Sequence, residues 1–414
     1  MCGVCGFAGQ GSRADLWAMT QAMVHRGPDG EGMYVDREQA VFLGHRRLSI
    51  LDLEGGHQPM WNWDEHVGVV FNGEIYNHAD LRQELLAKGH VFQSDHSDTE
   101  VLVHGFEEWG TSLPERLNGM FAFAIYDRRQ RKLFLARDRF GKKPLFYSQR
   151  NELFAFASEL TALARHPLVD DTIDVRSLKK YLAYNFLPAP NALYKGVRKL
   201  PGGHWLTYDI DSETVTIQSY WQFRIEPIES IPADAEQRWG DELLHLLSQA
   251  VKRRLISDVP LGIFLSGGID SSAILALAGQ HVDRGQLKTF AVGFNEPSFD
   301  ESAFARRAAE WAGAQHHEEI FSPTQARDVM PHVLRKLDEP LGDPSILPTY
   351  LVARMARPKI TVALGGDGSD ELFAGYDTFH ALRPARWYDR LVPRPLCTRF
   401  FEPWPPCCPF LVRT

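Results

Sequence analysis

The sequence predicts an N-terminal half built on β-sheets and a C-terminal half built on a parallel sheet with helices on both faces. Short apolar and aromatic runs dominate up to about residue 165, whereas strands alternate with helices from Trp239 onward. The stretch Leu187–Leu206, with three prolines and three glycines, is interpreted as a connector, and Arg224–Asp234 shows no clear period. We therefore expect one domain at 1–210 and a second at 230–414.

Five runs in the N-terminal half have the composition of β-strands. Most are bounded by Gly, Asn, Asp or Arg, which commonly end strands. Two further segments, His78–Lys88 and Asp98–Trp109, carry apolar residues at helical spacing. Because strands dominate, we expect sheets packed face to face with helices outside. The five runs are Val67–Phe71, Met120–Tyr126, Lys132–Ala136, Leu145–Tyr147 and Leu153–Phe156.

Helices and strands alternate in the C-terminal half, which implies a parallel, doubly wound sheet. The predicted helices are 242–256, 271–280 and 301–314, and the predicted strands are 261–265, 288–294 and 360–364. The end of the chain, from about residue 393, holds many prolines and no periodicity. We therefore expect this second domain to be incomplete, through truncation or a shifted reading frame.

Composition and charge exclude several classes of protein. Hydrophobic residues make up 44% and charged residues 24% of the 414 residues, which is ordinary for a soluble globular protein. A net charge of −8 provides no basic surface, so we expect no nucleic-acid partner. No apolar run approaches the roughly 20 residues that span a bilayer. Because the N-terminus also lacks the order of a signal peptide, we expect a cytoplasmic protein without a membrane partner.

The five cysteines do not suggest a disulfide scaffold, because their number is odd in a long chain. Cys2 and Cys5 have the C-x-x-C spacing of half a zinc site or of a redox motif. The sequence has no second such pair, and no strand precedes this one, so both chemistries lack the context that they need. We expect Cys5 to be a small buried residue on a first strand.

Cys2 is a candidate nucleophile, because removal of Met1 makes it the N-terminal residue. It then carries both a reactive thiol and a free α-amine. An α-amine, with an unperturbed pKa of about 7.7–8.0, can act as a general base near neutral pH. Such a residue forms an acyl-transfer centre without a His or Asp partner, although an incidental cysteine is the simpler interpretation of this position alone.

Other side chains in the N-terminal half suit an acyl-transfer site. Arg47 can pair bidentately with a carboxylate, the alternative being a solvated surface charge. Asn72 and Gly73 are expected at a turn after a strand, where they suit an oxyanion hole or form an ordinary hairpin. Asp98 can pair with an ammonium group or cap a helix. The turn cluster His25–Gly30 is interpreted as structural.

A glycine-rich loop, LSGGIDSS from Leu265 to Ser272, lies between a predicted strand and a predicted helix. Its glycines let the backbone approach a phosphate, and the helix N-terminus supplies N–H donors. Asp270 in this setting is a candidate Mg²⁺ ligand. The loop lacks the Gly-Lys-Ser/Thr of a Walker motif, so transfer of a γ-phosphate is not implied. A capped glycine turn is the alternative. Hydroxyl donors are provided by Ser266, Ser271 and Ser272.

A second glycine turn, LGGDGSDELF from Leu364 to Phe373, also follows a predicted strand. Its acidic residues repel a bare phosphate but are compatible with one that carries Mg²⁺. The alternative is an acidic start to the next helix. In a doubly wound sheet both loops lie at the carboxyl ends of strands, where ligands bind.

Several segments of the N-terminal half resemble the glutaminase domain of class II, N-terminal-nucleophile glutamine amidotransferases. They are MCGVCGFAG, HRGPDG, GHRRLSILD, FNGEIYN, SDTE and RDRFGKKPLFY. The resemblance implies an αββα sandwich in which Cys2 attacks the side-chain amide of glutamine, while Asn72 and Gly73 stabilise the oxyanion. It also implies that Arg47 holds the α-carboxylate and Asp98 the α-amine. The implied pocket lining is Leu48, Ser49, Ile50, Leu51 and Glu74.

The motifs SGGIDSS, TFAVGF and GGDGSDELFAGY resemble the synthetase domain of glutamine-hydrolysing asparagine synthetases, an ATP-pyrophosphatase-type α/β fold. The resemblance implies that ATP activates a carboxylate as an acyl-adenylate. Asp270 and Asp370 are then expected to hold Mg²⁺-pyrophosphate. Asp367, where well-known asparagine synthetases carry Glu, is expected to assist adenylate formation or to deprotonate ammonia. The implied nucleotide contacts are Leu265, Ser266, Gly267, Gly268, Asp270, Ser271, Ser272, Val292, Gly365 and Gly366.

The sequence therefore predicts glutamine-dependent amidation of a carboxylate acceptor, with glutamine, ATP, Mg²⁺ and aspartate as its expected ligands. Two alternatives stay open. The acceptor can be a sugar or cell-surface acid, or the chain can act only as a glutaminase or binding module. We also expect a tunnel for ammonia between the domains, lined by residues near 137–147 and 200–204. The resemblance leaves a homodimer open.

Overall fold

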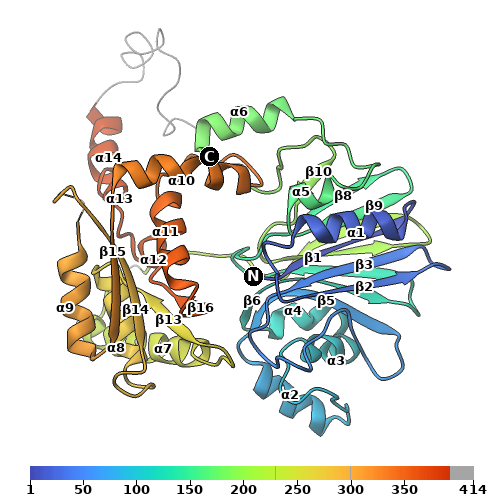
Figure 1. The fold of residues 1–414 in the computed structure, drawn as a ribbon, viewed down its shortest axis with the longest axis horizontal. Helices are drawn as coiled ribbons and strands as arrows, with labels where there is room; N and C mark the ends of the chain where they lie inside the picture. The colour runs from blue at the N-terminus through green and yellow to red at the C-terminus, as the bar shows by residue number, and fades with distance from the viewer. Residues whose placement is uncertain (229, 299, 392–414) are drawn as a thin grey trace.

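The structure, a computed structural model, describes residues 1–228, 230–298 and 300–391 and consists of two parts that lie side by side (Figure 1). The first part holds two six-stranded antiparallel sheets, and the second holds one four-stranded parallel sheet. Within these residues, no helix is both long enough and apolar enough to cross a membrane.

The two sheets of the first part are built from twelve strands. The first sheet has the order β10 (Val197–Lys199), β8 (Phe146–Arg150), β9 (Leu153–Ala157), β1 (Gly3–Gly9), β3 (Val41–Arg47) and β2 (Gly30–Asp36). The second has the order β12 (Thr214–Ser219), β11 (His204–Asp209), β7 (Lys132–Arg137), β6 (Gly119–Asp127), β5 (Val67–Ile75) and β4 (Met60–Trp61).

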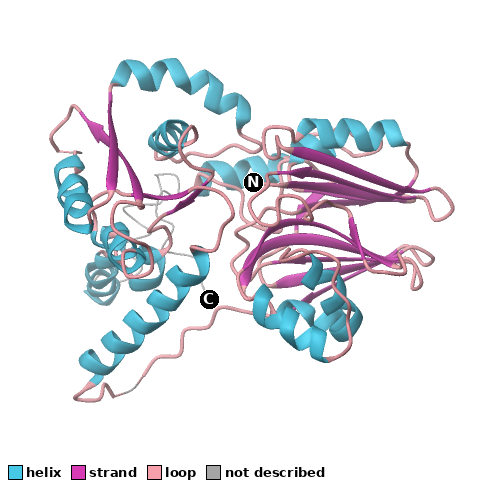
Figure 2. Ribbon diagram, turned by 60° about the horizontal axis from the view of Figure 1, so that its bottom comes forward, coloured by secondary structure: helices cyan, strands magenta, loops and turns pink. Residues whose placement is uncertain are grey.

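Alternation along β1 shows how the layers form. Val4 and Ala8 point into the core between the sheets, whereas Cys5 and Phe7 face the outer layer of helices. The outer layers are α1 (Arg13–Ala22) and α5 (Leu160–Leu163) on one side, and α2 (His78–Ala87), α3 (Glu100–Trp109) and α4 (Leu113–Arg116) on the other. Figure 2 shows the two stacked sheets with helices outside. The predicted αββα sandwich is confirmed, as is the burial of Cys5.

The five predicted strands and two predicted helices of this part are confirmed, within a few residues at their ends. The interpretation of Leu187–Leu206 as a connector was wrong. This stretch contains β10 and the start of β11, which pair with β8 and β7. Its apolar residues Val197, Leu200 and Leu206 are buried in the two cores. Prolines and glycines between such short strands hid their pattern, because Pro201 to Gly203 form the turn that joins them.

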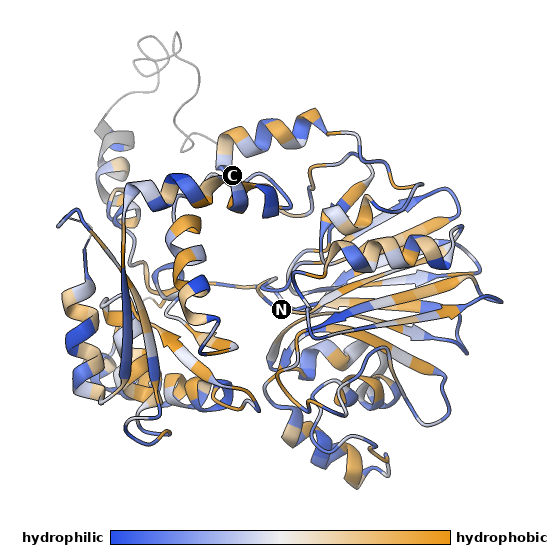
Figure 3. Cartoon of the chain, in the orientation of Figure 1, coloured by the Kyte–Doolittle hydropathy of each residue, from blue (hydrophilic) through white to orange (hydrophobic). Residues whose placement is uncertain are grey.

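The second part begins after residues 221–234, which contain no helix or strand where they are described. Its sheet has the order β15 (Gln315–Phe321), β14 (Lys288–Phe294), β13 (Leu261–Phe264) and β16 (Val362–Leu364), all parallel. The hydrophilic edge strand β15 stands out in Figure 3; polar edge strands resist pairing with other chains.

Helices pack on both faces of this sheet, as predicted. On one face, Leu275 of α8 (Ile269–Ala278) and Ala305 of α9 (Ser302–Ala312) belong to one hydrophobic core. On the other face, Ala356 of α11 (Ile346–Ala356) packs with Phe290 in a second, smaller core. The sequence pattern missed α6 (Val175–Tyr184), β15, α10 (Pro323–Lys336) and α11. The remaining helices are α7 (Ala235–Arg254), α12 (Ser369–Phe373), α13 (Asp377–His380) and α14 (Leu382–Leu391). The expectation about the end of the chain, from residue 393, lies outside the described residues.

Candidate active site

The predicted residues of the N-terminal half come from three neighbouring elements. Cys2 directly precedes β1, and Arg47 ends the adjacent strand β3. Asn72 and Gly73 lie within β5 of the facing sheet. The expectation of a turn at Asn72-Gly73 was wrong, because β5 continues to Ile75 through its pairing with β6. Sheet stacking, rather than a local turn, therefore brings Asn72 to Cys2.

These residues surround a pocket of about 290 Å³. Two predicted lining residues, Ser49 and Asp98, do not reach its surface; the Ser49 N–H donates to the Asp29 carboxylate, and Asp98 is buried. One wall comes from the second part of the protein, at Thr361–Ala363 around the start of β16. The predicted residues that line the pocket are Cys2, Arg47, Leu48, Ile50, Leu51, Asn72, Gly73 and Glu74.

The Cys2 thiol lies against the backbone of Leu48. The Leu48 N–H donates to the sulfur at 3.4 Å, and the thiol faces the Leu48 carbonyl at 3.7 Å. Burial raises the pKa of the Cys2 thiol, and the Leu48 N–H opposes that effect. In the unprocessed chain, the Met1 ammonium donates to the Arg26 carbonyl, and burial lowers the pKa of this amine to about 6. An amine at this depth is therefore a base near neutral pH.

Arg26 holds the backbone of Cys2. Its Nε donates to the Cys2 carbonyl at 2.8 Å, and its Nη1 pairs with Glu159 at 3.0 Å. Arg26 and Glu159 are almost fully buried, so this pair is shielded from solvent. The turn cluster His25–Gly30, interpreted as structural, thus contributes to the site by fixing where the Cys2 main chain lies.

The Asn72 side chain is buried and has no hydrogen-bond partner at Nδ2 or Oδ1 within the described residues. An unpaired buried amide costs about 1–3 kcal/mol, so such groups usually indicate a site that a ligand or water completes. Gly73 beside it has no room for a side chain, since a Cβ would lie 2.1 Å from the Met120 carbonyl oxygen.

Arg47 is buried, and its guanidinium is fixed by three backbone carbonyls of the following loop. Nη2 donates to the Leu51 and Asp52 carbonyls at 3.2 and 2.6 Å, and Nη1 donates to the Leu53 carbonyl at 2.9 Å. The guanidinium also lines the pocket. The alternative of a solvated surface charge is thus wrong, because the loop holds a buried cation at the edge of the pocket.

Glu74 and Asp98 place two carboxyl groups close together on the same side of the pocket. Burial raises the pKa of Asp98 to about 6. Burial, and then the nearby Asp98 carboxylate, raise the pKa of Glu74 well above its ordinary value. Asp98 accepts the Ile75 N–H at 2.9 Å and does not cap α3, which begins at Glu100. Neither carboxylate forms an ion pair with a described residue, and this arrangement favours a cationic ligand.

Sequence reasoning missed several residues of the pocket. Gln58 accepts the Phe71 N–H at 2.6 Å and donates to the Thr99 hydroxyl at 3.2 Å, so it fixes the pocket floor. The order of residues along the chain carries no signal for these contacts, because they depend on tertiary packing. The lining residues missed are Met1, Gly56, Gln58, Phe71, Thr99, Met120, Lys143 and Thr361–Ala363.

The two glycine loops of the second part meet at the carboxyl ends of the neighbouring strands β13 and β16. A Cβ on Gly366 would lie 2.9 Å from the Ser271 backbone nitrogen and 3.0 Å from the Asp270 Cβ. Gly267 has a φ of +89°, which favours glycine, and its Cβ position meets the start of α9. The two predicted loops therefore form one concave backbone surface at the N-terminus of α8.

The Ser266 and Ser271 hydroxyls of the first loop are hydrogen-bonded within it. They contact each other at 3.0 Å, the Gly268 N–H donates to the Ser266 hydroxyl at 3.2 Å, and Gly268 is the N-cap of α8. Within the described residues, the carboxylates of Asp270, Asp367 and Asp370 form no ion pair. Val292 lies on the neighbouring strand β14, and Leu265 is buried beneath the loop. Acidic groups beside a backbone cradle fit a metal-bound pyrophosphate.

A separate cluster of His90, His104 and Glu107 has ligand types that suit a metal. Burial alone would lower the pKa of His104, but the Glu100 and Glu107 carboxylates, which accept hydrogen bonds from its ring, raise it to about 9. His104 is therefore held as an imidazolium between two carboxylates, 3.1 Å from Glu107. A protonated imidazole cannot bind a metal, so this cluster is better explained as a charge network that anchors α3.

Family comparisons agree with this geometry. The model of the glutamine amidotransferase domain family matches residues 1–221, and the asparagine synthase model matches residues 242–405. The fold and the pocket define a glutamine amidotransferase domain that is joined to an asparagine synthase domain.

Three relatives that match about nine tenths of this chain identify the family more closely. Asparagine synthetase (glutamine-hydrolyzing) 1 of Bacillus subtilis is 38% identical over 90% of this chain and 57% of its own length. Asparagine synthetase (glutamine-hydrolyzing) 3 of the same organism is 34% identical over 92% of this chain and 64% of its own length. A provisionally named asparagine synthetase (glutamine-hydrolyzing) 2 of Methanocaldococcus jannaschii is 35% identical over 91% of this chain and 76% of its own length. The chain belongs to the glutamine-hydrolysing asparagine synthetase family, and it spans about three fifths of the length of the two Bacillus relatives.

The unpaired Asn72 amide generates a prediction about stability. Asn72→Leu keeps the shape of the side chain but removes the unsatisfied polar atoms, so we expect the free energy of unfolding to rise by about 1 kcal/mol. Asn62 is the matched control, because it is also buried but its amide bonds Glu107 and the backbone of His66 and Val67. Asn62→Leu is expected to lower stability by about 2 kcal/mol. Urea unfolding measures the free energy of unfolding of both variants. If Asn72→Leu destabilises the protein as much as Asn62→Leu does, the Asn72 amide is not unpaired.

Proposed function

We propose that the chain uses glutamine as a nitrogen donor for ATP-dependent amidation of a carboxylate, with aspartate as the acceptor. The pocket that is lined by both Cys2 and Asn72, whose amide is unpaired within the described residues, carries this proposal. The first part, through β12, is the glutaminase domain. The second part, from about residue 230, is the synthetase domain. The family relatives support both assignments.

Glutamine hydrolysis begins after Met1 is removed. The α-amine of Cys2 takes the thiol proton, and the sulfur attacks the side-chain amide carbon of glutamine. The Asn72 Nδ2 group and the Gly73 N–H stabilise the charge that develops on the amide oxygen. The C–N bond then breaks, and the amine returns its proton to the departing nitrogen, which leaves as ammonia. Water hydrolyses the remaining thioester, and this step releases glutamate and restores the thiol.

The α-carboxylate and the α-ammonium of glutamine bind to different side chains of the site. Arg47 pairs with the α-carboxylate, since it presents a fixed buried guanidinium there. Glu74, which lines the pocket, receives the α-ammonium, and the buried Asp98 carboxylate behind it attracts the same charge, which relieves the repulsion between two buried carboxyl groups. The backbone of Leu48, Ile50 and Leu51 lines the pocket beside them.

The two glycine loops of the second part bind ATP. The backbone of 265–268 and 365–366 lies against the nucleotide, and the Ser266, Ser271 and Ser272 hydroxyls face its phosphates. Asp270 and Asp370 would hold Mg²⁺, which would supply positive charge against the pyrophosphate. Asp367 lies in the second loop as an exposed carboxylate, and it serves adenylate formation or deprotonation of ammonia. Attack of ammonia on the activated acceptor then yields the amide and AMP.

Ammonia passes between the two parts. Arg137 ties together the two segments expected along this route, because it donates to the Lys143 carbonyl at 2.7 Å and to the Leu200 carbonyl at 2.6 Å. The Cys2 pocket also reaches Thr361–Ala363 of the second part. A passage along this boundary keeps ammonia away from bulk water.

The role of Cys2 leads to a direct prediction. Cys2→Ala is expected to lower glutamine hydrolysis by at least about 10³-fold, because no other group can form the thioester. Cys5→Ala is the matched control, since Cys5 is fully buried on the outer face of β1 and does not line the pocket. Release of glutamate from glutamine measures both, and hydrolysis by Cys2→Ala at the wild-type rate contradicts the mechanism.

Pyrophosphate release by the chain tests the acceptor. With ATP, Mg²⁺ and free ammonia, both wild type and Cys2→Ala are expected to release pyrophosphate only when aspartate is added. Pyrophosphate with a sugar acid, and none with aspartate, would assign a different acceptor. Glutamate release without pyrophosphate for any acceptor would restrict the activity of this chain to glutamine hydrolysis.

The pKa of Asp98 predicts how glutamine affinity depends on pH. The carboxylate must be ionised to pair with the α-ammonium, and its pKa of about 6 means that it is neutralised as the pH falls through this value. Because glutamine itself does not titrate between pH 5 and 7, its affinity for the Cys2→Ala protein is expected to fall at least about fivefold across that range. Calorimetric titration of the Cys2→Ala protein with glutamine measures this affinity at each pH. A constant affinity, or an equal loss in Asp98→Asn, contradicts the assignment.

A further inference from the structure

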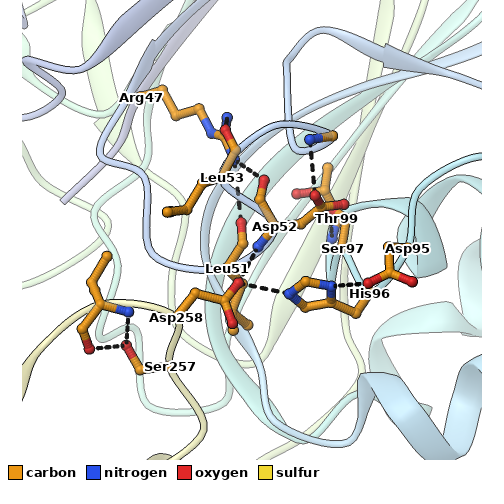
Figure 4. A network of polar contacts seen from close by, with 12 residues as sticks. Arg47, Leu51, Asp52, Leu53, Asp95, His96, Ser97, Thr99, Ser257 and Asp258 are labelled. Carbon is orange, nitrogen blue, oxygen red and sulfur yellow. Dashed lines mark hydrogen bonds and ion pairs between the residues drawn. The ribbon is translucent and has the colours of Figure 1, made fainter.

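Asp258 is a residue of the second part that makes its polar contacts with the first. It lies between α7 and β13, and its carboxylate accepts the Asp52 N–H at 2.8 Å. Its own N–H donates to the Ile50 carbonyl at 3.1 Å. The same carboxylate oxygen contacts His96 Nε2 at 2.6 Å. Figure 4 shows Asp258 at the centre of this network.

The first segment that Asp258 contacts carries the loop that fixes Arg47. Asp52 has a φ of +47°, a left-handed conformation that Asp tolerates better than most residues. In this conformation its N–H faces Asp258, while its carbonyl accepts from the Arg47 guanidinium. Asp258 therefore fixes the loop at Asp52, the residue whose carbonyl holds Arg47. Arg47 is the residue assigned to the α-carboxylate of glutamine.

The second segment that Asp258 contacts leads to the residues assigned to the α-ammonium of glutamine. His96 is two residues before Asp98, which is assigned to the α-ammonium, and three before Thr99, which lines the pocket. His96 Nδ1 contacts the exposed carboxylate of Asp95 at 2.8 Å. Hydrogen bonds with Asp258 and then Asp95 raise the pKa of His96. The His96 side chain thus links Asp258 to the segment that carries Asp98.

We propose that Asp258 is a positioning residue for glutamine binding, which sets the spacing between Arg47 and Asp98 by holding both of their loops. This inference rests on the proposed glutaminase function. It makes the affinity of the first part for glutamine dependent on a residue of the second part. Asp258 lies just before β13, whose other end carries the SGGIDSS loop, so one short strand connects this contact with the candidate nucleotide site.

Glutamine hydrolysis by the full chain tests this role, because positioning predicts a change in KM rather than in kcat. Asp258→Ala removes both side-chain contacts and is expected to raise the KM for glutamine about fivefold, with kcat within about twofold of wild type. The size is modest because the Asp258 and His96 side chains are partly exposed. Asp258→Asn keeps an acceptor for the Asp52 N–H but loses the charge that faces His96. Asp258→Asn is expected to raise the KM for glutamine about twofold, and it is the variant to measure if Asp258→Ala does not fold.

Asp95→Asn is the matched control. It removes the other carboxylate on His96, but Asp95 is exposed and contacts neither the second part nor the pocket, so KM is expected to stay at the wild-type value. An unchanged KM in folded Asp258→Ala, or a fall in kcat at constant KM, overturns the positioning role while leaving the glutaminase function intact. Absence of glutamine hydrolysis in the wild-type chain itself overturns the proposed function and this inference together.

Discussion

The contact between the Cys2 sulfur and the backbone of Leu48 depends on the pairing of two strands, and the rest of the site is arranged around it. Antiparallel pairing of β1 with β3 places Gly3 opposite Arg46, so the residues just beyond these strand ends lie side by side. Stacking of the second sheet then brings Asn72 to the same pocket as Cys2. A shift of one residue in either strand would exchange the inner and outer faces, and the thiol would lose its pocket.

The pocket contains several polar groups whose burial is incompletely compensated in the unbound protein. The Asn72 amide has no described partner, and Glu74 and Asp98 place two carboxyl groups together in a buried setting. Each arrangement costs free energy in the absence of a ligand, which binding can recover. The candidate nucleotide site of the α/β half differs, since it consists mainly of two glycine loops that meet at strand ends beside the N-terminus of α8. The two candidate sites thus differ in their groups, buried polar side chains in one and glycine loops in the other.

Much of the fold could be predicted because period and composition report local structure. β14 was predicted with its observed bounds, since its apolar run is continuous and ends at clear breaks. β10 and β11 could not be found, because β10 has only three residues and both strands lie beside prolines and glycines that obscure the pattern. β15 was missed since QHHEEIF is mostly polar, although its backbone completes the sheet edge. Most of the site residues predicted in the N-terminal half line one pocket, but the parts played by Arg26, Gln58 and Asp258 depend on contacts between segments far apart in the chain.

Covalent labelling with a diazoketone analogue of glutamine tests most directly whether Cys2 is the nucleophile of a glutamine pocket. Intact-mass measurement followed by peptide mapping should find one adduct per chain, on Cys2 as the N-terminal residue after loss of Met1, and excess glutamine should prevent it. An adduct on another residue, or glutamine hydrolysis by a chain that retains Met1 and carries no adduct, would contradict the account.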